Sequence, residues 1–583
     1  MEKNLSTFYR KDIDGLRAIA VLSVILYHFG YLPNGYLGVD IFFVISGYLI
    51  TKIIFKEVIE NKFSITQFYL RRIRRIIPLV LFTTSIALII ASFVMLPDDL
   101  DNLSQSVIAT NFFANNILLL ITTGNYWNIV NEYKPLMHTW SLGIEEQFYL
   151  IYPLIFLTFQ KKRIRWILPI LLLLTIISMT MFISSSDEAY KFYSIQFRFF
   201  ELSLGGIGSI VFRDKIIKTN YKLLLLPIIF LILISNIDLP SSLKLFLIII
   251  SSLGVLLSVN NKNKLDSFIL ENKMMVYIGK ISFSLYMWHQ IVLAFARYFI
   301  FEKYNVIDSV FIFIFILFLS IVSYIFIEQP FRDKNRIKTS ILLWYSSILF
   351  IISTFSSLYI YSKAGIIKDF SELDLTKDKH QRDMNIKYNN RINDLDKDFT
   401  TNNKIKILAI GNSFARDWSN ILLESKYGNF IEISYIPNIN NSKNLIKKLN
   451  QAKYIFFSET DKDYFDKIVP QFKIDSSKVW NIGTKNFGLQ NGIFYNKKHD
   501  SDYCNQRTNI EKSFFEKNDL LKKQWGNKYI DLIGMIVDKN NTLPVFTPDC
   551  KFISEDCKHL TRNGAIYFAK LIENNNNFKI ENN

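Results

Sequence analysis

An arginine and a histidine lie eleven residues apart in the apolar stretch DGLRAIAVLSVILYH, which covers residues 14–28. On an α-helix this spacing corresponds to about three turns and about 16 Å of rise, so Arg17 and His28 project from one face. A guanidinium binds phosphate groups, and an imidazole acts as a general base or as an acyl carrier. The pair suits a site that holds an anionic donor and transfers a group. An arginine that snorkels to the membrane surface and a histidine satisfied at the interface would give the same pattern.

Further ionisable residues lie within apolar segments. His138 and Glu145 are seven residues apart in HTWSLGIEEQFYLIYP and share a face if this segment is helical. Glu201 lies in FRFFELSLGG, and His289 lies near the middle of ISFSLYMWHQIVLAF. Because ionisable groups are costly inside a bilayer and usually line a pathway or a site, we expect these four residues to belong to a site.

A group of four arginines, Arg71, Arg72, Arg74 and Arg75, precedes an apolar segment at 76–96. Arginines at this position can set the membrane topology. They can also clamp a phosphorylated donor that approaches from the cytoplasm.

Half of the 583 residues are apolar, and almost every long apolar run ends by Tyr361, which indicates a membrane protein. Eleven segments are long enough, or nearly so, to cross about 30 Å of hydrocarbon. These segments are 13–30, 37–55, 76–96, 144–159, 166–184, 195–212, 223–236, 243–259, 278–300, 309–327 and 340–361. The stretch 105–121 is interrupted by Asn111, Asn115 and Asn116, so we expect a re-entrant or surface helix there.

Basic loops fall on every second connection between these segments, and the alternate loops are weakly charged or acidic. The positive-inside rule then places the N-terminus in the cytoplasm, and an odd number of spans places everything after Tyr361 outside. The formal charge of +17 arises largely in these loops, so we expect a lipid bilayer and no nucleic acid as a partner.

The chain after Tyr361 has a different composition. Residues 362–403 are polar and are expected to be a linker, whereas strand-like runs alternate with amphipathic stretches over 404–575. This alternation predicts an α/β domain with a parallel sheet after a multi-span helical membrane domain at 1–361. All three cysteines lie in this half, and a Cys550–Cys557 bridge or free thiols fit the sequence equally well.

Two short motifs in the α/β half suggest a serine nucleophile. KIKILAIGNSFARDW (404–418) predicts a strand that turns into a helix at Ser413, where backbone N–H groups and the helix dipole favour an oxyanion site. Near the end of the chain, Asp556 and His559 are three residues apart, as an orienting carboxylate and a general base would be. Taken singly, the first motif fits a plain helix cap, and the second fits a surface Asp and His.

The N-terminal motifs resemble the acyltransferase family 3 membrane domain. In chain order they are Arg17 with His28, GYLGVDIFFVISGYLIT (35–51), FYLRRIRRIIP (68–78), HTWSLGIEEQFYL (138–150), FFELSLGG (199–206), SFSLYMWH (282–289) and IEQPFR (327–332). The resemblance implies that His28 is the essential histidine, that Arg17 is its companion, and that Arg72 and Arg75 contact the phosphates of acetyl-CoA. His28 could act either as a general base or as an acyl carrier, and the sequence does not select between these two roles.

The C-terminal motifs together resemble the SGNH/GDSL hydrolase fold, a three-layer α/β domain. The resemblance implies that Ser413 is the nucleophile, Asp556 the orienting residue and His559 the general base. Oxyanion donors would come from NIGTKNFGLQNG (481–492), where Gly483 and Asn486 are the candidates and Asn486 is preferred.

We therefore expect an O-acetyltransferase in the plasma or inner membrane of a bacterium, with its C-terminal domain outside the cytoplasm. Acetyl-CoA would be the donor substrate, and a cell-envelope polysaccharide (O-antigen, capsule or peptidoglycan) or a lipid-linked oligosaccharide would be the acceptor. We expect no bound cofactor and no metal site. Alternatives are a proton-coupled transporter with an outer binding domain, or a carbohydrate esterase, because a serine triad does not by itself distinguish water from sugar.

Overall fold

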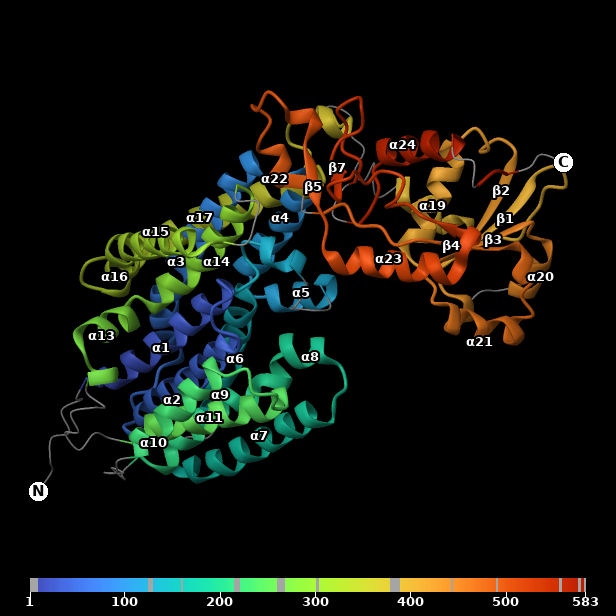
Figure 1. Cartoon of the computed structure of the whole chain (residues 1–583). Helices are drawn as coiled ribbons and strands as arrows, with labels where there is room; N and C mark the ends of the chain where they lie inside the picture. Colours follow the sequence, from blue (N-terminus) through green and yellow to red (C-terminus); the bar gives the residue numbers. More distant parts are fainter. Residues whose placement is uncertain are drawn as a thin grey trace, which may run out of the picture. The chain divides into compact units, whose positions relative to one another are not determined.

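The computed structural model describes residues 9–123, 129–158, 161–213, 221–258, 268–299, 304–377, 388–441, 444–488, 491–554, 558–574 and 578–580. The chain divides into two compact units (Figure 1). The helical unit comprises Met1–Phe93 and Asp99–Tyr361, and the α/β unit comprises Val94–Asp98 and Ser362–Asn583.

Helices form nearly all of the helical unit. They are α1 (Lys11–His28), α2 (Gly38–Ile59), α3 (Ile65–Val94), α4 (Pro97–Asn111), α5 (Asn115–Thr123), α6 (Thr139–Thr158), α7 (Ile167–Ser184), α8 (Glu188–Tyr193), α9 (Ile195–Val211), α10 (Tyr221–Ile234), α11 (Ser241–Leu257), α13 (Lys273–Lys280), α14 (Ser282–Arg297), α15 (Val306–Ser323), α16 (Gln329–Arg332) and α17 (Thr339–Ser362). A helix occupies each of the eleven apolar segments that the sequence singled out.

Five helical segments are long and apolar enough to cross a membrane. They are Gly35–Ile59, Ile65–Val94, Ile164–Ser184, Val306–Arg332 and Thr339–Ser362, and α10 and α11 are shorter apolar helices. The helical unit is therefore that of a multi-pass membrane protein, while the count of eleven crossings and their orientation remain predictions.

The asparagine-rich stretch at 105–121 breaks into α4 and α5 around Phe113, whose φ is 53°. Its asparagines are buried rather than exposed, which excludes a simple surface helix. Asn115 donates to Thr139 Oγ1 at 2.7 Å, and Asn116 donates to the Tyr193 carbonyl oxygen at 3.0 Å. The amides tie this segment into the helical unit because a buried amide needs hydrogen-bond partners.

Helices α2 and α9 pack with their backbones in close approach. A Cβ added to Gly47 would lie 1.7 Å from the Leu202 carbonyl oxygen, and one added to Gly205 would lie 2.2 Å from the Val44 carbonyl oxygen. Glycines that let two helix backbones approach closely are a common feature of membrane-helix packing. This packing fixes the Asp40 end of α2 against Arg198 and Glu201 on α9.

We expect Gly205→Ala to destabilise the helical unit by about 1–3 kcal/mol, because the new methyl group meets rigid backbone. Gly208→Ala on the same helix is the matched control, since its methyl group meets only the end of the flexible Leu253 side chain. The measurement is the midpoint of thermal unfolding in detergent. Equal shifts for the two variants would contradict the proposed close approach of α2 and α9.

The α/β unit is built on a five-stranded parallel sheet, which confirms the α/β prediction. The strands are β1 (Ile405–Ile410), β2 (Ile431–Ile436), β3 (Tyr454–Ser458), β4 (Val479–Ile482) and β6 (Tyr529–Ile530), in the order β2-β1-β3-β4-β6. Strands β5 (Arg507–Asn509) and β7 (Thr542–Pro544) form a separate antiparallel pair. The chain leaves β1 toward β2 and returns to the other side of β1 with β3, so the order reverses between β1 and β3.

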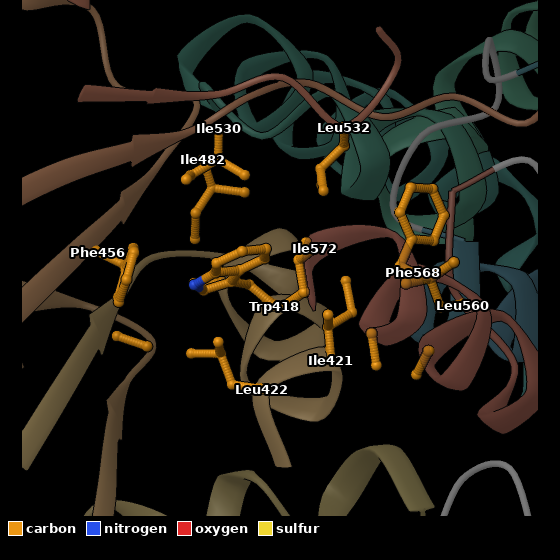
Figure 2. Close-up of a cluster of buried hydrophobic side chains, with 14 of the residues drawn as sticks. Trp418, Ile421, Leu422, Phe456, Ile482, Ile530, Leu532, Leu560, Phe568 and Ile572 are labelled. Atoms are coloured by element: carbon orange, nitrogen blue, oxygen red, sulfur yellow. The ribbon is translucent and has the colours of Figure 1, made fainter. Parts of the chain in front are cut away.

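Helices cover both faces of the sheet. Successive side chains of a strand point to opposite faces, and here both sets are apolar, so both faces must be buried. Ile407 and Ala409 of β1 face the layer of α19 (Ser413–Glu424) and α24 (Arg562–Glu573), whose core centres on Trp418 (Figure 2). Leu408 and Ile410 face the layer of α20 (Leu445–Gln451), α21 (Lys462–Phe472) and α23 (Lys512–Trp525). The unit thus has three layers.

The segment expected to be a linker belongs largely to the α/β unit. Ile392 is fully buried in the core beside α19, and Phe370 is fully buried as well. Arg391 donates to Asn420 at 3.0 Å and to Glu424 at 2.9 Å. The polar composition of this segment gave no sign of these contacts, because two isolated apolar side chains are enough to hold a segment against a core.

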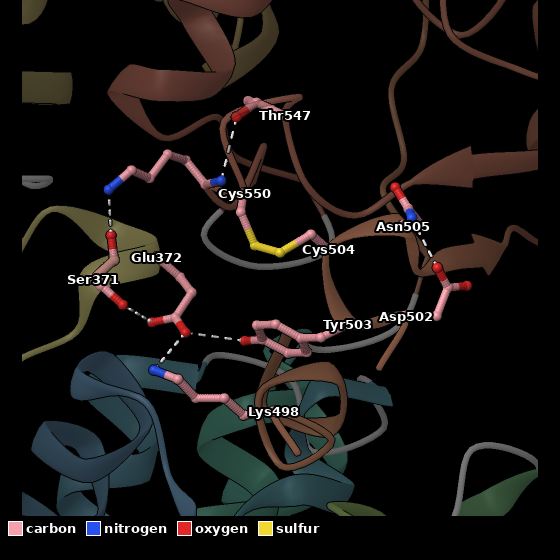
Figure 3. The surroundings of a disulfide bond; sticks show 10 residues. Ser371, Glu372, Lys498, Asp502, Tyr503, Cys504, Asn505, Thr547 and Cys550 are labelled. Atoms are coloured by element: carbon pink, nitrogen blue, oxygen red, sulfur yellow. Dashed lines mark hydrogen bonds and ion pairs between the residues drawn. A yellow bond between two sulfur atoms is a disulfide. The ribbon is translucent and has the colours of Figure 1, made fainter. Parts of the chain in front are cut away.

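A disulfide joins Cys504 and Cys550 (Figure 3). The structure therefore corrects the suggested Cys550–Cys557 pairing, and Cys557 lies outside the described residues. Beside the disulfide, Glu372 accepts hydrogen bonds from Tyr503 and Ser371 and forms an ion pair with Lys498 at 2.7 Å. Burial raises the pKa of Glu372, but the hydrogen bond and charge of Lys498 outweigh it, so this pKa lies below its usual value.

Removing the disulfide with Cys504→Ala and Cys550→Ala is expected to destabilise the α/β unit by about 2–4 kcal/mol, because the bridge closes a loop between residues 46 apart. The thermal unfolding of the full chain, measured with and without reductant, checks this. Wild-type protein in reductant should match the double variant. An unchanged unfolding midpoint in both cases would show that the bridge does not stabilise the unit.

Candidate active site

A cavity of about 300 Å³ in the helical unit is lined by four arginines, Arg17, Arg72, Arg75 and Arg332. They come from α1, α3 and α16, so the fold gathers cations that are far apart in the sequence. Glu145 lines the same cavity and accepts hydrogen bonds from Ser46 at 2.9 Å and Tyr149 at 3.3 Å. The cavity can hold a polyanionic ligand, because the cations outnumber the carboxylate that faces them.

The arginine group at 71–75 divides into two pairs. Arg71 donates to both oxygens of Glu57 at 3.0 Å, and buried Arg74 donates to the carbonyl oxygens of Phe331 and Ile337. Neither of these lines the cavity, whereas Arg72 and Arg75 do. The structure thus separates two arginines that hold the fold from two that face the cavity.

Three histidines that the sequence singled out lie together. The ring of His289 is 5.3 Å from that of His28 and 5.2 Å from that of His138, measured between centroids. His289 Nδ1 lies 2.6 Å from the Tyr286 carbonyl oxygen, so Nδ1 carries a proton and donates it. In the neutral ring Nε2 is then unprotonated, and it has no hydrogen-bond partner among the described residues.

A small cavity next to this group is lined by His28 and His138, and it shares Val39 and Tyr286 with the arginine cavity. Arg17 lines the arginine cavity and His28 lines the small cavity, and both residues belong to α1. His138 precedes α6, so the helical spacing that would place it on one face with Glu145 does not apply. His138 lines the small cavity and Glu145 lines the arginine cavity.

Glu201 belongs to a buried charged cluster beside the histidines. Arg198 donates to Asp40 at 2.9 Å and to Glu201 at 2.8 Å, and all three side chains are buried. Asp40 and Arg198 also line the small cavity near His28. Burying an unpaired charge costs much free energy, and the ion pairs with Arg198 offset this cost for the two carboxylates.

In the α/β unit, Ser413 is the first residue of α19 and directly follows β1 and its turn. Gly411 has a φ of 132°, and a Cβ there would collide with Ser458 Oγ at the end of β3. Asn412 caps the helix through its side-chain oxygen, which accepts from Phe414 N at 3.0 Å. Ser413 thus lies at the carboxyl edge of the sheet where the strand order reverses, the usual place for a ligand in such folds.

Tyr435 at the end of β2 holds this turn from the other side. Its hydroxyl donates to the Gly411 carbonyl oxygen at 3.0 Å. Burial raises the pKa of Tyr435, although Arg416 lowers it in part. The phenol therefore stays protonated at neutral pH and remains a donor to the turn.

The segment that carries His559 is tied to the serine helix. Leu560 N donates to Asp417 Oδ2 at 3.1 Å, and Asp417 lies one helical turn after Ser413. Lys485 also donates to Asp417, and both side chains are 1% exposed. Asp417 therefore anchors the neighbour of His559 to α19, while Asp556 lies outside the described residues.

The two oxyanion candidates have other partners. Gly483 N donates to the Ile530 carbonyl oxygen at 2.8 Å, which continues the pairing of β4 with β6 and leaves no amide for an oxyanion. Asn486 Oδ1 accepts from Gly488 N at 2.7 Å, so its oxygen closes a turn. The amide NH₂ of Asn486 stays a candidate, and Gly483 does not.

Sequence reasoning missed several residues of these sites, namely Asp40, Arg198, Tyr286, Arg332, Asp417, Tyr435 and Lys485. Asp40, Arg198, Tyr286 and Arg332 lie inside or beside the recognised motifs, which was the available signal. No group of three or more His, Cys, Asp or Glu that could hold a metal ion occurs within the described part of the chain.

The long apolar helices define a multi-pass membrane protein, and the buried histidines beside the arginine cavity give it an internal site. Residues 10–328 match the family described as an acyltransferase domain (Acyl_transf_3). This match covers more than half of the chain, so the chain belongs to acyltransferase family 3.

The relatives in Staphylococcus aureus carry O-acetyltransferase in their names. O-acetyltransferase OatA of strain NCTC 8325 / PS 47 is 30% identical over 364 residues, which is 58% of this chain and 59% of the relative. SAR0937 of strain MRSA252 is 32% identical over 374 residues, which is 58% of this chain and 60% of the relative. The aligned part thus spans about three fifths of these curated relatives. No solved structure was found to match the chain.

Proposed function

We propose that the protein is a membrane O-acetyltransferase that moves an acetyl group from cytoplasmic acetyl-CoA onto hydroxyl groups of a cell-envelope polysaccharide. The family and the O-acetyltransferase names of the relatives support this activity. The observation that carries the proposal is that Arg17 and His28 lie on one helix and line two cavities that share Val39 and Tyr286. A donor phosphate group and a reacting histidine would then be held on one path.

In the first stage, the arginine cavity binds the phosphates of acetyl-CoA with the thioester directed toward the histidines. His28 either takes the proton from an acceptor hydroxyl group that attacks the thioester, or accepts the acetyl group on its imidazole, and in each case the released proton passes to the departing CoA sulfur. In both cases the thioester C–S bond breaks, a new bond to the acetyl carbonyl carbon forms, and CoA leaves as the thiol.

In the second stage, Ser413 of an SGNH-like outer domain carries the acetyl group as an ester. His559 takes the proton from Ser413 when the ester forms and gives it to the group that releases the acetyl, so that its imidazole is neutral again. It then takes the proton of a sugar hydroxyl, which attacks the ester carbonyl, and returns a proton to Ser413 as the C–O bond of the ester breaks. The position of Ser413 at the sheet edge and the tie between Leu560 and Asp417 support this role.

Donor binding can be tested with a matched pair of arginines. We expect Arg72→Ala to raise the KM for acetyl-CoA about tenfold or more, because a charged hydrogen bond to phosphate is lost. Arg71→Ala, whose side chain is paired with Glu57 and does not line the cavity, should leave the KM within about twofold. Release of free CoA by protein in nanodiscs measures both. If the two variants had the same KM, the arginine cavity would not be the donor site.

A further inference from the structure

A second large cavity in the helical unit has no role in the scheme above. It has a volume of about 630 Å³, within the range of about 300–1,000 Å³ that is typical of ligand sites. Its walls include Tyr36, Asp40, Phe182, Lys191, Arg198 and Phe246. It shares Tyr36, Asp40 and Arg198 with the small cavity beside His28, so the histidines lie between it and the arginine cavity.

The cavity is formed by one end of the helical unit. Its residues come from the 3₁₀ turn Gly35–Leu37 and the start of α2, the end of α7, α8, and the starts of α9 and α11. The alternation of loop charges predicts that these helix ends face outward, opposite to the arginine cavity. The cavity is therefore placed to meet a molecule from the outer side.

The charges around the cavity disfavour an anion. Lys191 pairs with Glu188 at 2.9 Å, and Arg198 is shared between Asp40 and Glu201. Both cations that line the cavity, Lys191 and Arg198, thus already form ion pairs with carboxylates, so the described lining offers no unpaired cation to hold an anion. The same charges disfavour a lipid acyl chain, because it could not satisfy the hydrogen bonds of these groups.

The remaining features suit a neutral polyhydroxyl molecule. Arg198 is buried, and its Nε has no hydrogen-bond partner within the part of the chain that the structure describes. The exposed side chains of Ser241 and Ser242 lie at the same cavity as the rings of Phe182 and Phe246. A sugar presents hydroxyl groups to such donors and acceptors and an apolar face to such rings.

We propose that this outer cavity binds one neutral sugar unit of the acceptor glycan. The inference rests on the proposed function, since it names the class of acceptor that the helical unit holds. A polymer held through one sugar unit has a raised local concentration near the protein, which favours transfer to its other units.

The test is saturation-transfer NMR on the full chain in nanodiscs. The probes are neutral tetrasaccharides of glucose, galactose, mannose and N-acetylglucosamine, with tetragalacturonate as the anionic comparison. Ser242→Trp fills the cavity from an exposed position, and Ser186→Trp, an exposed serine outside the cavity, is the matched control. Phe246→Ala provides a second variant if Ser242→Trp elutes as misfolded protein.

We expect at least one neutral probe to bind, with its signal reduced at least tenfold by Ser242→Trp and kept in Ser186→Trp. Absence of binding by every neutral probe, a preference for tetragalacturonate, or binding unaffected by both cavity variants would overturn the inference. Labelling of Ser413 from radioactive acetyl-CoA is measured in parallel and should persist in Ser242→Trp. Absence of that labelling in wild-type protein would refute the proposed function, whereas the sugar-binding result would still test the cavity.

Discussion

Ser413→Ala is expected to abolish acetylation of the envelope glycan while the protein stays folded and inserted. The substitution removes the oxygen that would carry the acetyl group, so transfer should fall by at least about a thousandfold. The methyl group of alanine fits the first turn of α19, where Asn412 still caps the helix. NMR of the glycan, which detects the O-acetyl methyl signal, measures the loss.

Ser513→Ala is the matched control for this variant, because Ser513 also lies in the first turn of a helix of the α/β unit. It should retain wild-type acetylation. Full glycan acetylation by Ser413→Ala would refute the two-stage scheme, and loss of acetylation in both variants would point to a general fault in folding.

His28→Gln is expected to reduce acetyl transfer by at least about a hundredfold at both stages, since neither a base nor an acyl carrier remains at this position. Binding of acetyl-CoA should change little, because the arginine cavity does not include His28. The measurements are the label on Ser413 and the affinity for acetyl-CoA in the same preparation.

His499→Gln serves as the control, because His499 is exposed in the α/β unit. Normal labelling of Ser413 in His28→Gln would show that the acetyl group reaches the outer domain without this histidine. A parallel loss of acetyl-CoA affinity would instead assign His28 to donor binding.

Much of the architecture follows from local patterns. The prediction that Arg17 and His28 lie on one helix is confirmed, since α1 runs without interruption from Lys11 to His28. Short apolar runs correctly predict the parallel strands, because strands buried on both faces need apolar side chains at successive positions. The site residues keep their assigned roles as predictions until they are tested.

Pairings between distant residues could not be predicted in this way. Arg198 and Asp40 are 158 residues apart, and only the close packing of α2 on α9 brings them together. Arg72 and Arg74 differ by two positions but face a cavity and a structural contact respectively, which depends on the neighbouring α16 and α17. Three cysteines allow three pairings, and the sequence does not select Cys504–Cys550 among them.

The central claim is that acetyl groups pass through the helical unit to Ser413. Its most direct test supplies radioactive acetyl-CoA to the outside of sealed inside-out vesicles, followed by digestion and mapping of the labelled peptide. The account predicts label on the peptide that contains Ser413 in wild-type protein and none in His28→Gln. Movement of a solute without labelled peptide or glycan would identify a carrier, and a labelled glycan without any label on Ser413 in rapidly quenched samples would contradict the acyl-serine relay.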